Sequence, residues 1–157
     1  MLDFCGMPME TTKGRRQEPV TQFSIFTPNR LGRLNEVIRL FGTRGVNVLA
    51  LMVMDTTDSA IIRVVVDAPD EARELLASES FPFTESRLVA VEVNSSELGR
   101  LMAALLEAEL NINYLYSFIP QPQGKSLLGL SMEDNDLAEQ VLTRHQFRVL
   151  RQSDIAR

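Results

Sequence analysis

One stretch of the sequence decides the fold: Asn29-Arg-Leu-Gly-Arg-Leu-Asn-Glu-Val-Ile-Arg-Leu-Phe-Gly-Thr-Arg-Gly-Val-Asn-Val48. Its apolar residues recur at i, i+3, i+4 and i+7, which predicts an amphipathic helix; they are Leu34, Val37, Ile38 and Phe41. Gly42 and Gly45 predict the end of that helix. An apolar run at 46–54 then predicts a strand. The stretch is therefore a loop, a helix, a turn and the start of a strand.

The flanking elements complete a recognisable order. Phe23 and Ile25 alternate with polar neighbours, which predicts a strand at 20–26. The β-branched run at 60–66 predicts another strand, and Pro69 followed by acidic residues predicts a second helix. A short strand at 81–86 comes last. The order β-α-β-β-α-β is that of the split βαβ, ferredoxin-like unit.

The whole pattern then repeats. We expect strands at 88–93, 112–118, 126–132 and 147–150, and helices at 98–105 and 137–142, from the same periodicities. The fold class is therefore α+β: two tandem ferredoxin-like units, each an antiparallel sheet with its helices on one face. We expect a flexible tail at 1–19, a first unit at 20–86 and a second at 87–157. Because an exposed edge strand is a liability, we also expect the two units to pack side by side, joining their sheets.

Two shifts align the two copies. A shift of 64 residues superimposes the first helix and the following strand of each unit, and a shift of 66 superimposes the remaining strands and the second helix. Insertions then fall only in loops, where they are best tolerated. In this register Gly32 corresponds to Ser96, and Gly99 lies inside a helix.

Composition excludes several classes of protein. The chain has 157 residues, 45% hydrophobic and 24% charged, as a packed domain needs. A net charge of −5 and a pI near 4.9 argue against a nucleic-acid partner or a membrane surface. One histidine and one cysteine, Cys5, cannot build a Cys/His zinc cage, so we expect no metal and no cofactor. No apolar h-region opens the chain, and the expected location is the cytoplasm.

The loop before each unit's first helix is the candidate ligand site. A helix N-terminus offers free N–H groups to an anion, and Gly32 allows close approach to the backbone. Asn29 and Asn47 could hydrogen-bond a small zwitterion, although the residues alone favour an N-cap and a turn residue as their roles. In the second unit Asn94 and Glu97 could form a capping box.

These residues resemble the ACT domain, an amino-acid-binding regulatory module. Asn29-Arg-Leu-Gly-Arg-Leu34, a helix and Gly45-Val-Asn-Val48 follow its usual pattern. Glu107-Ala-Glu-Leu-Asn-Ile-Asn-Tyr-Leu-Tyr-Ser-Phe118 resembles the second half of small bacterial tandem-ACT proteins. The chain departs from the family pattern at Leu31, where the family has Pro, and in the shortened second loop, which lacks both Pro and Gly. The resemblance covers about 20–151.

The resemblance implies a regulatory protein without catalysis that alters a partner such as an amino-acid biosynthetic enzyme. We also expect a homodimer, because an exposed edge strand is a liability. Ligands of the family lodge between paired domains. By position, the ligand-binding residues implied here are Asn29, Arg30, Leu31, Gly32, Asn47 and Val48, with Asn94, Ser95, Ser96, Asn111 and Ile112 in the second unit. The first unit is the better site. A regulatory subunit of an acetolactate synthase-type enzyme, or an interaction module that has lost its ligand, are alternative interpretations.

Two other features have ordinary explanations. His145 could be a catalytic nucleophile, but a cation at a helix C-terminus is the simpler interpretation. Tyr114, Tyr116 and Phe118 on one strand are reminiscent of base-stacking platforms, but alternate tyrosines are also typical of packing on a sheet face. We therefore predict no catalytic residue.

Overall fold

The computed structural model describes residues 18–28, 31–120 and 126–156. The expected tail, including Cys5, lies almost wholly outside the described residues. The first unit, called unit 1 below, holds β1 Val20–Pro28, α2 Arg33–Gly42, β2 Val48–Asp55, β3 Ser59–Val66, α3 Pro69–Ser78 and the first half of β4 Phe83–Val93. Unit 2 holds the second half of β4, the 3-10 turn η1 Ser95–Glu97, α4 Leu98–Glu107, β5 Ile112–Ser117, β6 Ser126–Met132, α5 Asn135–Arg144, β7 Arg148–Leu150 and α6 Gln152–Ile155.

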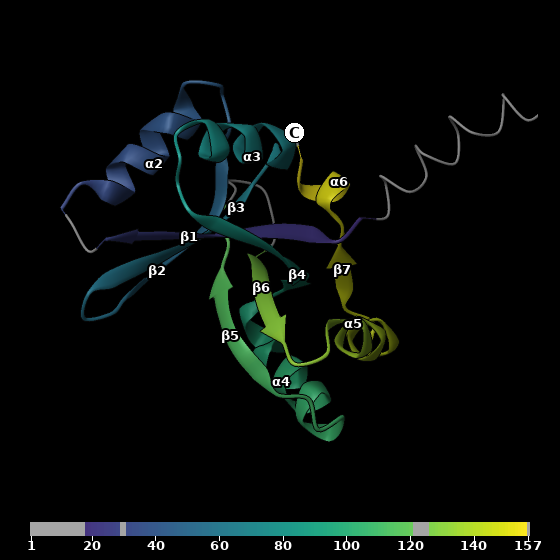
Figure 1. Ribbon diagram of the computed structural model, residues 1–157. Helices are drawn as coiled ribbons and strands as arrows, with labels where there is room; N and C mark the ends of the chain where they lie inside the picture. Colours follow the sequence, from purple (N-terminus) through teal and green to yellow (C-terminus); the bar gives the residue numbers. More distant parts are fainter. Residues whose placement is uncertain (1–17, 29–30, 121–125, 157) are drawn as a thin grey trace, which may run out of the picture.

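Each unit has the ferredoxin-like strand order. In unit 1 the order is β2-β3-β1-β4, in unit 2 it is β7-β4-β6-β5, and all pairings are antiparallel. Figure 1 shows α2 and α3 on one side of the first sheet, with α4 and α5 on the far side of the second. The α+β fold class and the two tandem units are confirmed.

One strand belongs to both sheets. The segment of β4 from Phe83 to Leu88 pairs with β1, and the segment from Val89 to Val93 pairs with β6. The sequence suggested two strands at 81–86 and 88–93, but the chain runs through without a break, so the expected boundary at 86/87 lies inside β4. The sheets are thus joined by a shared strand.

Backbone hydrogen bonds confirm the register of the repeat. The turn after the first helix is closed by Val46 N donating to Phe41 O at 3.0 Å, and in unit 2 by Leu110 N to Leu105 O at 3.1 Å, 64 residues on. The turn after the second helix is closed by Phe81 N donating to Leu76 O, and Phe147 N donates to Leu142 O, 66 residues on. Each bond follows a residue with positive φ; these residues are Gly45, Ser80, Glu109 and Gln146.

The protein has three apolar cores among its described residues. Two lie between a sheet and its own helices, as the periodicity predicts. The third lies between the helix-free faces of the two sheets, where Val20 and Val65 of unit 1 meet Tyr116 and Leu150 of unit 2. The units are therefore joined side by side through β4, as expected, but they also turn these faces toward each other. The reason is that β1, β3 and β4 carry apolar residues on both faces, so each strand needs a cover on each side.

Two further contacts hold the units together. Ala50 of β2 forms an isolated bridge with Phe118, and Ile119 N donates to Leu49 O at 2.8 Å. These contacts join the first strand of the sheet order, β2, to the residues that follow the last, β5. The short C-terminal helix α6, which the sequence did not predict, docks on unit 1: Gln152 Nε2 donates to Val66 O at 3.1 Å.

No described helix is long and apolar enough to span a membrane.

A polar network lies inside the junction between the sheets. Gln22 is fully buried. Its Oε1 accepts from Tyr116 Oη at 2.6 Å, and its Nε2 donates to Tyr114 Oη at 2.7 Å and to Ser86 Oγ at 3.0 Å. Burial raises the pKa of Tyr116, since the ionised phenol would lose its hydration. Packing on the sheet face, the simpler interpretation of the tyrosines, is confirmed.

Candidate functional site

The start of α2 is an open helix N-terminus. Gly32 precedes it with a φ of +91°, and a Cβ at that position would meet no atom within 4 Å. The first backbone bond of the helix is Glu36 N donating to Gly32 O at 3.0 Å, and no described side chain caps the first turn. Leu31 is fully exposed. The N–H groups of the first turn have no intrahelical partner, so this end can receive an anion. Asn29 and Arg30 lie outside the described residues.

Asn47, at the start of β2, is held by an aspartate that sequence reasoning missed. Its backbone N donates to Asp67 Oδ1 at 2.9 Å and its Nδ2 to Asp67 Oδ2 at 2.8 Å. Asp67 N in turn donates to Asn47 O at 3.1 Å. Asp67 is buried, whereas Asn47 is exposed and Val48 half-buried. The pair ties the start of β2 to the end of β3. Its bonds use the backbone N–H and one of the two Nδ2 hydrogens of Asn47, and no bond from a described residue to the amide oxygen accompanies them.

The same pair recurs in unit 2 with weaker burial. Asn111 Nδ2 donates to Glu133 Oε2 at 2.7 Å, and Glu133 N donates to Asn111 O at 3.0 Å. Asn111 is exposed and Ile112 half-buried. Asp67 and Glu133 are 66 residues apart, which is the second shift of the repeat. The register of the repeat therefore pairs the two acids, and it is the sequence feature that could have pointed to them.

The first loop of unit 2 is closed on itself. Asn94 N donates to Glu97 Oε1 at 3.1 Å, as the capping box predicts. Ser95 and Ser96 form the 3-10 turn η1 and are exposed. Gly99 lies inside α4 as expected. The two loops therefore differ: α2 follows directly on Gly32, whereas α4 follows the turn η1, which the bond between Asn94 and Glu97 closes. No side chain among the described residues caps α4 itself.

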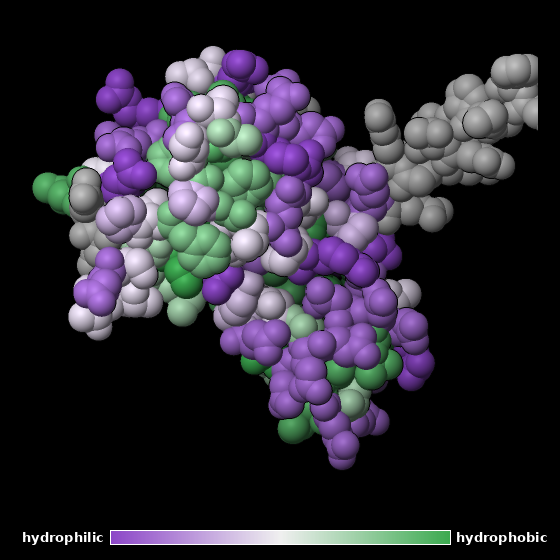
Figure 2. Space-filling view, viewed as in Figure 1, coloured by the Kyte–Doolittle hydropathy of each residue, from purple (hydrophilic) through white to green (hydrophobic). Residues whose placement is uncertain are grey.

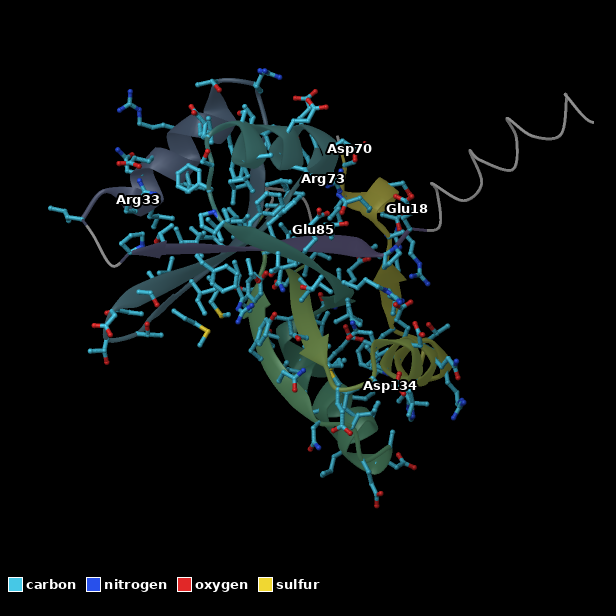
Figure 3. The ribbon with its side chains drawn as sticks, viewed as in Figure 1. Glu18, Arg33, Asp70, Arg73, Glu85 and Asp134 are labelled. Carbon is cyan, nitrogen blue, oxygen red and sulfur yellow. The ribbon has the colours of Figure 1, made fainter. Side chains whose placement is uncertain are left out.

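An open groove runs along α2, and sequence reasoning did not find it. Its volume is about 450 Å³, and it is lined by α2 and by the turn that follows α3. Arg33, the first residue of α2 (Figure 3), is one of the lining residues. Its guanidinium carbon lies 4.9 Å from the Phe81 ring centroid, and its Nη1 lies 2.7 Å from Glu36 Oε2. The groove thus begins at the first residue of α2, beside the open helix end.

The labelled acids and arginine of α3 and β4 form a surface ion cluster (Figure 3). Arg73 donates to both carboxylate oxygens of Glu85 at 2.7 Å and to Asp70 Oδ1 at 2.9 Å. The hydrogen bonds from Arg73 hold the pKa of Glu85 below its usual range. This cluster ties α3 to the sheet and lies outside the candidate loops.

His145 takes the position at the C-terminal end of α5. It is the C-cap residue, and its carbonyl oxygen accepts from Arg100 Nη1 at 2.7 Å. The interpretation of His145 as a helix-terminal residue fits this placement.

Comparison with known proteins identifies the family. A family model described as an ACT domain pair matches residues 19–157. Among solved structures, protein BT0572 from Bacteroides thetaiotaomicron is 26% identical, with a TM-score of 0.79 over 88% of this chain and 96% of that chain.

The regulatory subunit of aspartate kinase from Thermus thermophilus, in a ligand-free form, is 16% identical, with a TM-score of 0.59 over 82% and 91% of the two chains. A putative C-terminal regulatory domain of aspartate kinase from Porphyromonas gingivalis is 15% identical, with a TM-score of 0.52 over 82% and 91%. No curated protein matches this chain. At these identities both likenesses show the fold alone. The family model, which spans nearly the whole chain, shows that this protein belongs to the ACT family as a pair of ACT domains.

Proposed function

We propose that this chain is a non-catalytic regulatory protein that binds a small amino acid at the open end of α2 in unit 1. The observation that carries the proposal is the difference between the two units. The first turn of α2 follows directly on a positive-φ glycine, whereas α4 is preceded by the turn η1, which the bond between Asn94 and Glu97 closes.

The chemistry of this end suits the two charges of an amino acid. Its carboxylate would accept from the N–H groups of the first turn, where the helix dipole favours negative charge. Asn47 of the same chain cannot complete this site. Pro28, beside the open helix end, pairs with Ser59 at one end of β3, whereas Val48 pairs with Val66 at the other end, about 23 Å away. In a homodimer, the ammonium group would donate instead to the Asn47 amide oxygen of a second copy of the chain. The proposed site then combines Leu31, Gly32 and the undescribed Asn29 and Arg30 of one copy with Asn47 and Val48 of the other.

The output of such a protein passes through another molecule. ACT domains are regulatory modules, and solved proteins of this fold include regulatory subunits of aspartate kinase. We propose that the chain works as a homodimer in the cytoplasm and alters an enzyme of amino-acid metabolism. Ligand binding would favour one arrangement of paired domains, and the partner would respond to that shift.

A ligand-free interaction module is the second candidate. The hydrogen bonds between Asn47 and Asp67 favour it, because they give Asn47 a structural role that needs no ligand. The closed loop of unit 2 favours it for that half of the chain, so the positions from Asn94 to Ser96 and the pair Asn111 and Ile112 would then be structural.

Thermal unfolding with each proteinogenic amino acid tests the proposal. A ligand at about 100 times its Kd adds about 2.7 kcal/mol of stability, which at this size is a rise in Tm of about 5–11 °C. We expect one amino acid, or a small related set, to produce such a rise. No rise with any amino acid would leave the interaction module as the better account.

Matched variants locate the site. Asn47→Ala and Asn111→Ala remove the same side chain at equivalent positions of the two units. We expect the ligand-induced rise, measured against each variant's own ligand-free Tm, to be lost in Asn47→Ala and kept in Asn111→Ala. The reverse result would place the site in unit 2.

A further inference from the structure

Arg63 carries a positive charge that no described carboxylate neutralises. It lies in the middle of β3, is half-buried, and has no carboxylate oxygen of the described residues within 4.0 Å. Six other described arginines each have such a partner. A half-buried cation is costly unless it is paired. The position therefore calls for an anion that the described residues do not supply.

The contacts of Arg63 are neutral and come from both units. Its Nη1 donates to Ser24 Oγ of β1 at 2.8 Å. Its guanidinium carbon lies 4.3 Å from the ring centroid of Tyr114, which belongs to β5 of unit 2. The ring attracts the cation only in part. Arg63 is thus held in place at the junction of the two units without being neutralised.

One edge of the guanidinium remains without a good acceptor. Nε is buried and has no hydrogen-bond partner, and Nη2 meets only the sulfur of Met54, at 4.0 Å. A thioether is a weak acceptor. The Nε and Nη2 groups form the parallel pair of donors that binds a carboxylate in the bidentate manner. Met54 is 41% exposed and flexible, so its side chain can move aside to open this edge.

An apolar row lies next to Arg63 on the same sheet face. Arg63 pairs with Ser24 on one neighbouring strand and with Met52 on the other. Two residues further along each of the three strands lies the row Phe26–Ile61–Met54. Side chains two residues apart along a strand share a face and lie about 7 Å apart. Phe26 is 39% exposed, so this row is not fully covered. Figure 2 shows the surface stepping inwards between the two units.

We propose that Arg63 and the row Phe26–Ile61–Met54 form a second ligand site, for a small monocarboxylate that has an apolar tail and no ammonium group. The carboxylate would pair with the Nε and Nη2 edge, and the apolar tail would cover the row. An α-ammonium group would stand beside the guanidinium with no carboxylate to receive it. The site is separate from the one proposed at α2, because it uses β1, β2 and β3 at the junction with unit 2.

Isovalerate and valine are the matched probes, since they differ only by the α-ammonium group. The Nε–H signal of Arg63 in a ¹H–¹⁵N spectrum of the full chain reports binding at the guanidinium directly. We expect isovalerate to move this signal saturably, and valine to move it at least about tenfold more weakly. No movement with isovalerate, an equal movement with sodium chloride at the same ionic strength, or equal binding of valine would each overturn the proposal.

Two variants complete the test, with affinity read from the backbone amide of Ser24. Arg63→Lys keeps the charge but removes the paired donors, and we expect it to weaken isovalerate at least about tenfold, which corresponds to about 1.4 kcal/mol. Arg44→Lys, at an exposed position beyond α2, should leave binding unchanged. Unchanged affinity in Arg63→Lys would contradict the bidentate site. The site at Arg63 and the amino-acid site at α2 are tested separately: if isovalerate does not bind but an amino acid does, the second site is refuted and the proposed function is not.

Discussion

Replacing Tyr116 by phenylalanine tests the polar network between the two sheets. The hydroxyl of Tyr116 donates to Gln22 Oε1 at 2.6 Å, and Gln22 is fully buried. No other described donor binds that oxygen, so Tyr116→Phe leaves a buried acceptor without a partner. Such a group costs about 1–3 kcal/mol, and at this size that lowers Tm by about 2–12 °C.

Tyr114→Phe is the companion variant. It leaves one of the two N–H groups of Gln22 Nε2 without an acceptor, while the other still donates to Ser86 Oγ at 3.0 Å. One buried group is again left unpaired, so the expected loss is of the same size, about 1–3 kcal/mol. Urea unfolding followed by far-UV circular dichroism gives both values, provided that the m-value is unchanged. If either variant unfolds at the same urea midpoint as the wild type, the reasoning from unsatisfied groups is refuted.

Three further predictions concern packing and pH. Gly129→Ala places a Cβ 2.6 Å from the buried Leu88 Cδ2, so we expect a loss of about 1–3 kcal/mol in urea unfolding, part of which Leu88→Val should recover if the clash is the cause. Arg73 lowers the pKa of Glu85, so the pair stabilises the fold above the unfolded pKa of about 4.3 and loses this effect as pH falls through the lowered pKa. Glu85→Gln should cost no more than about 1 kcal/mol at neutral pH, because the pair is partly exposed, and the gap to wild type should close in acid; a constant gap in a pH series of urea midpoints would contradict this. Burial raises the pKa of Tyr116, so its contribution is fully present below the unfolded pKa of about 10 and is lost as pH rises through the folded pKa; Tyr116→Phe should therefore lose stability less steeply in alkali, and an equal slope would count against it.

The periodic features of the fold were predictable from the sequence. Helix stripes and strand alternation report directly on which side chains face a core, and the repeat register follows from them, as the bonds from Val46 and Leu110 confirm. The packing of the helix-free faces was less visible. Its only signal was the run at 60–66, where both faces of a strand are apolar except at Arg63. The partner of such a face cannot be found from periodicity, because pairing across 90 residues or more, as between Gln22 and Tyr116, leaves no local pattern.

The candidate loops were located by motif, and their local chemistry was only partly predictable. The capping box of Asn94 and Glu97 follows from adjacent residues and is confirmed. The partner of Asn47 was missed because Asp67 lies 20 residues away, across a hairpin, and only the repeat points to it. The ligand roles of these residues stay predictions. The groove beside Arg33 depends on the spacing between α2 and the turn after α3, which no sequence motif encodes.

The shared strand makes the two ACT domains depend on one alternation of side chains. Along β4, Leu88 and Ala90 face the junction between the sheets, whereas Val89 and Val91 face the helices of unit 2. A linker would absorb an inserted residue, but β4 has none. One residue inserted after Arg87 would exchange the two sets of side chains for the rest of the strand. An insertion of an odd number of residues in this segment would therefore turn the wrong side chains toward each core, whereas an insertion of an even number would keep each set on its own face. Loops of either domain could change in length without this constraint.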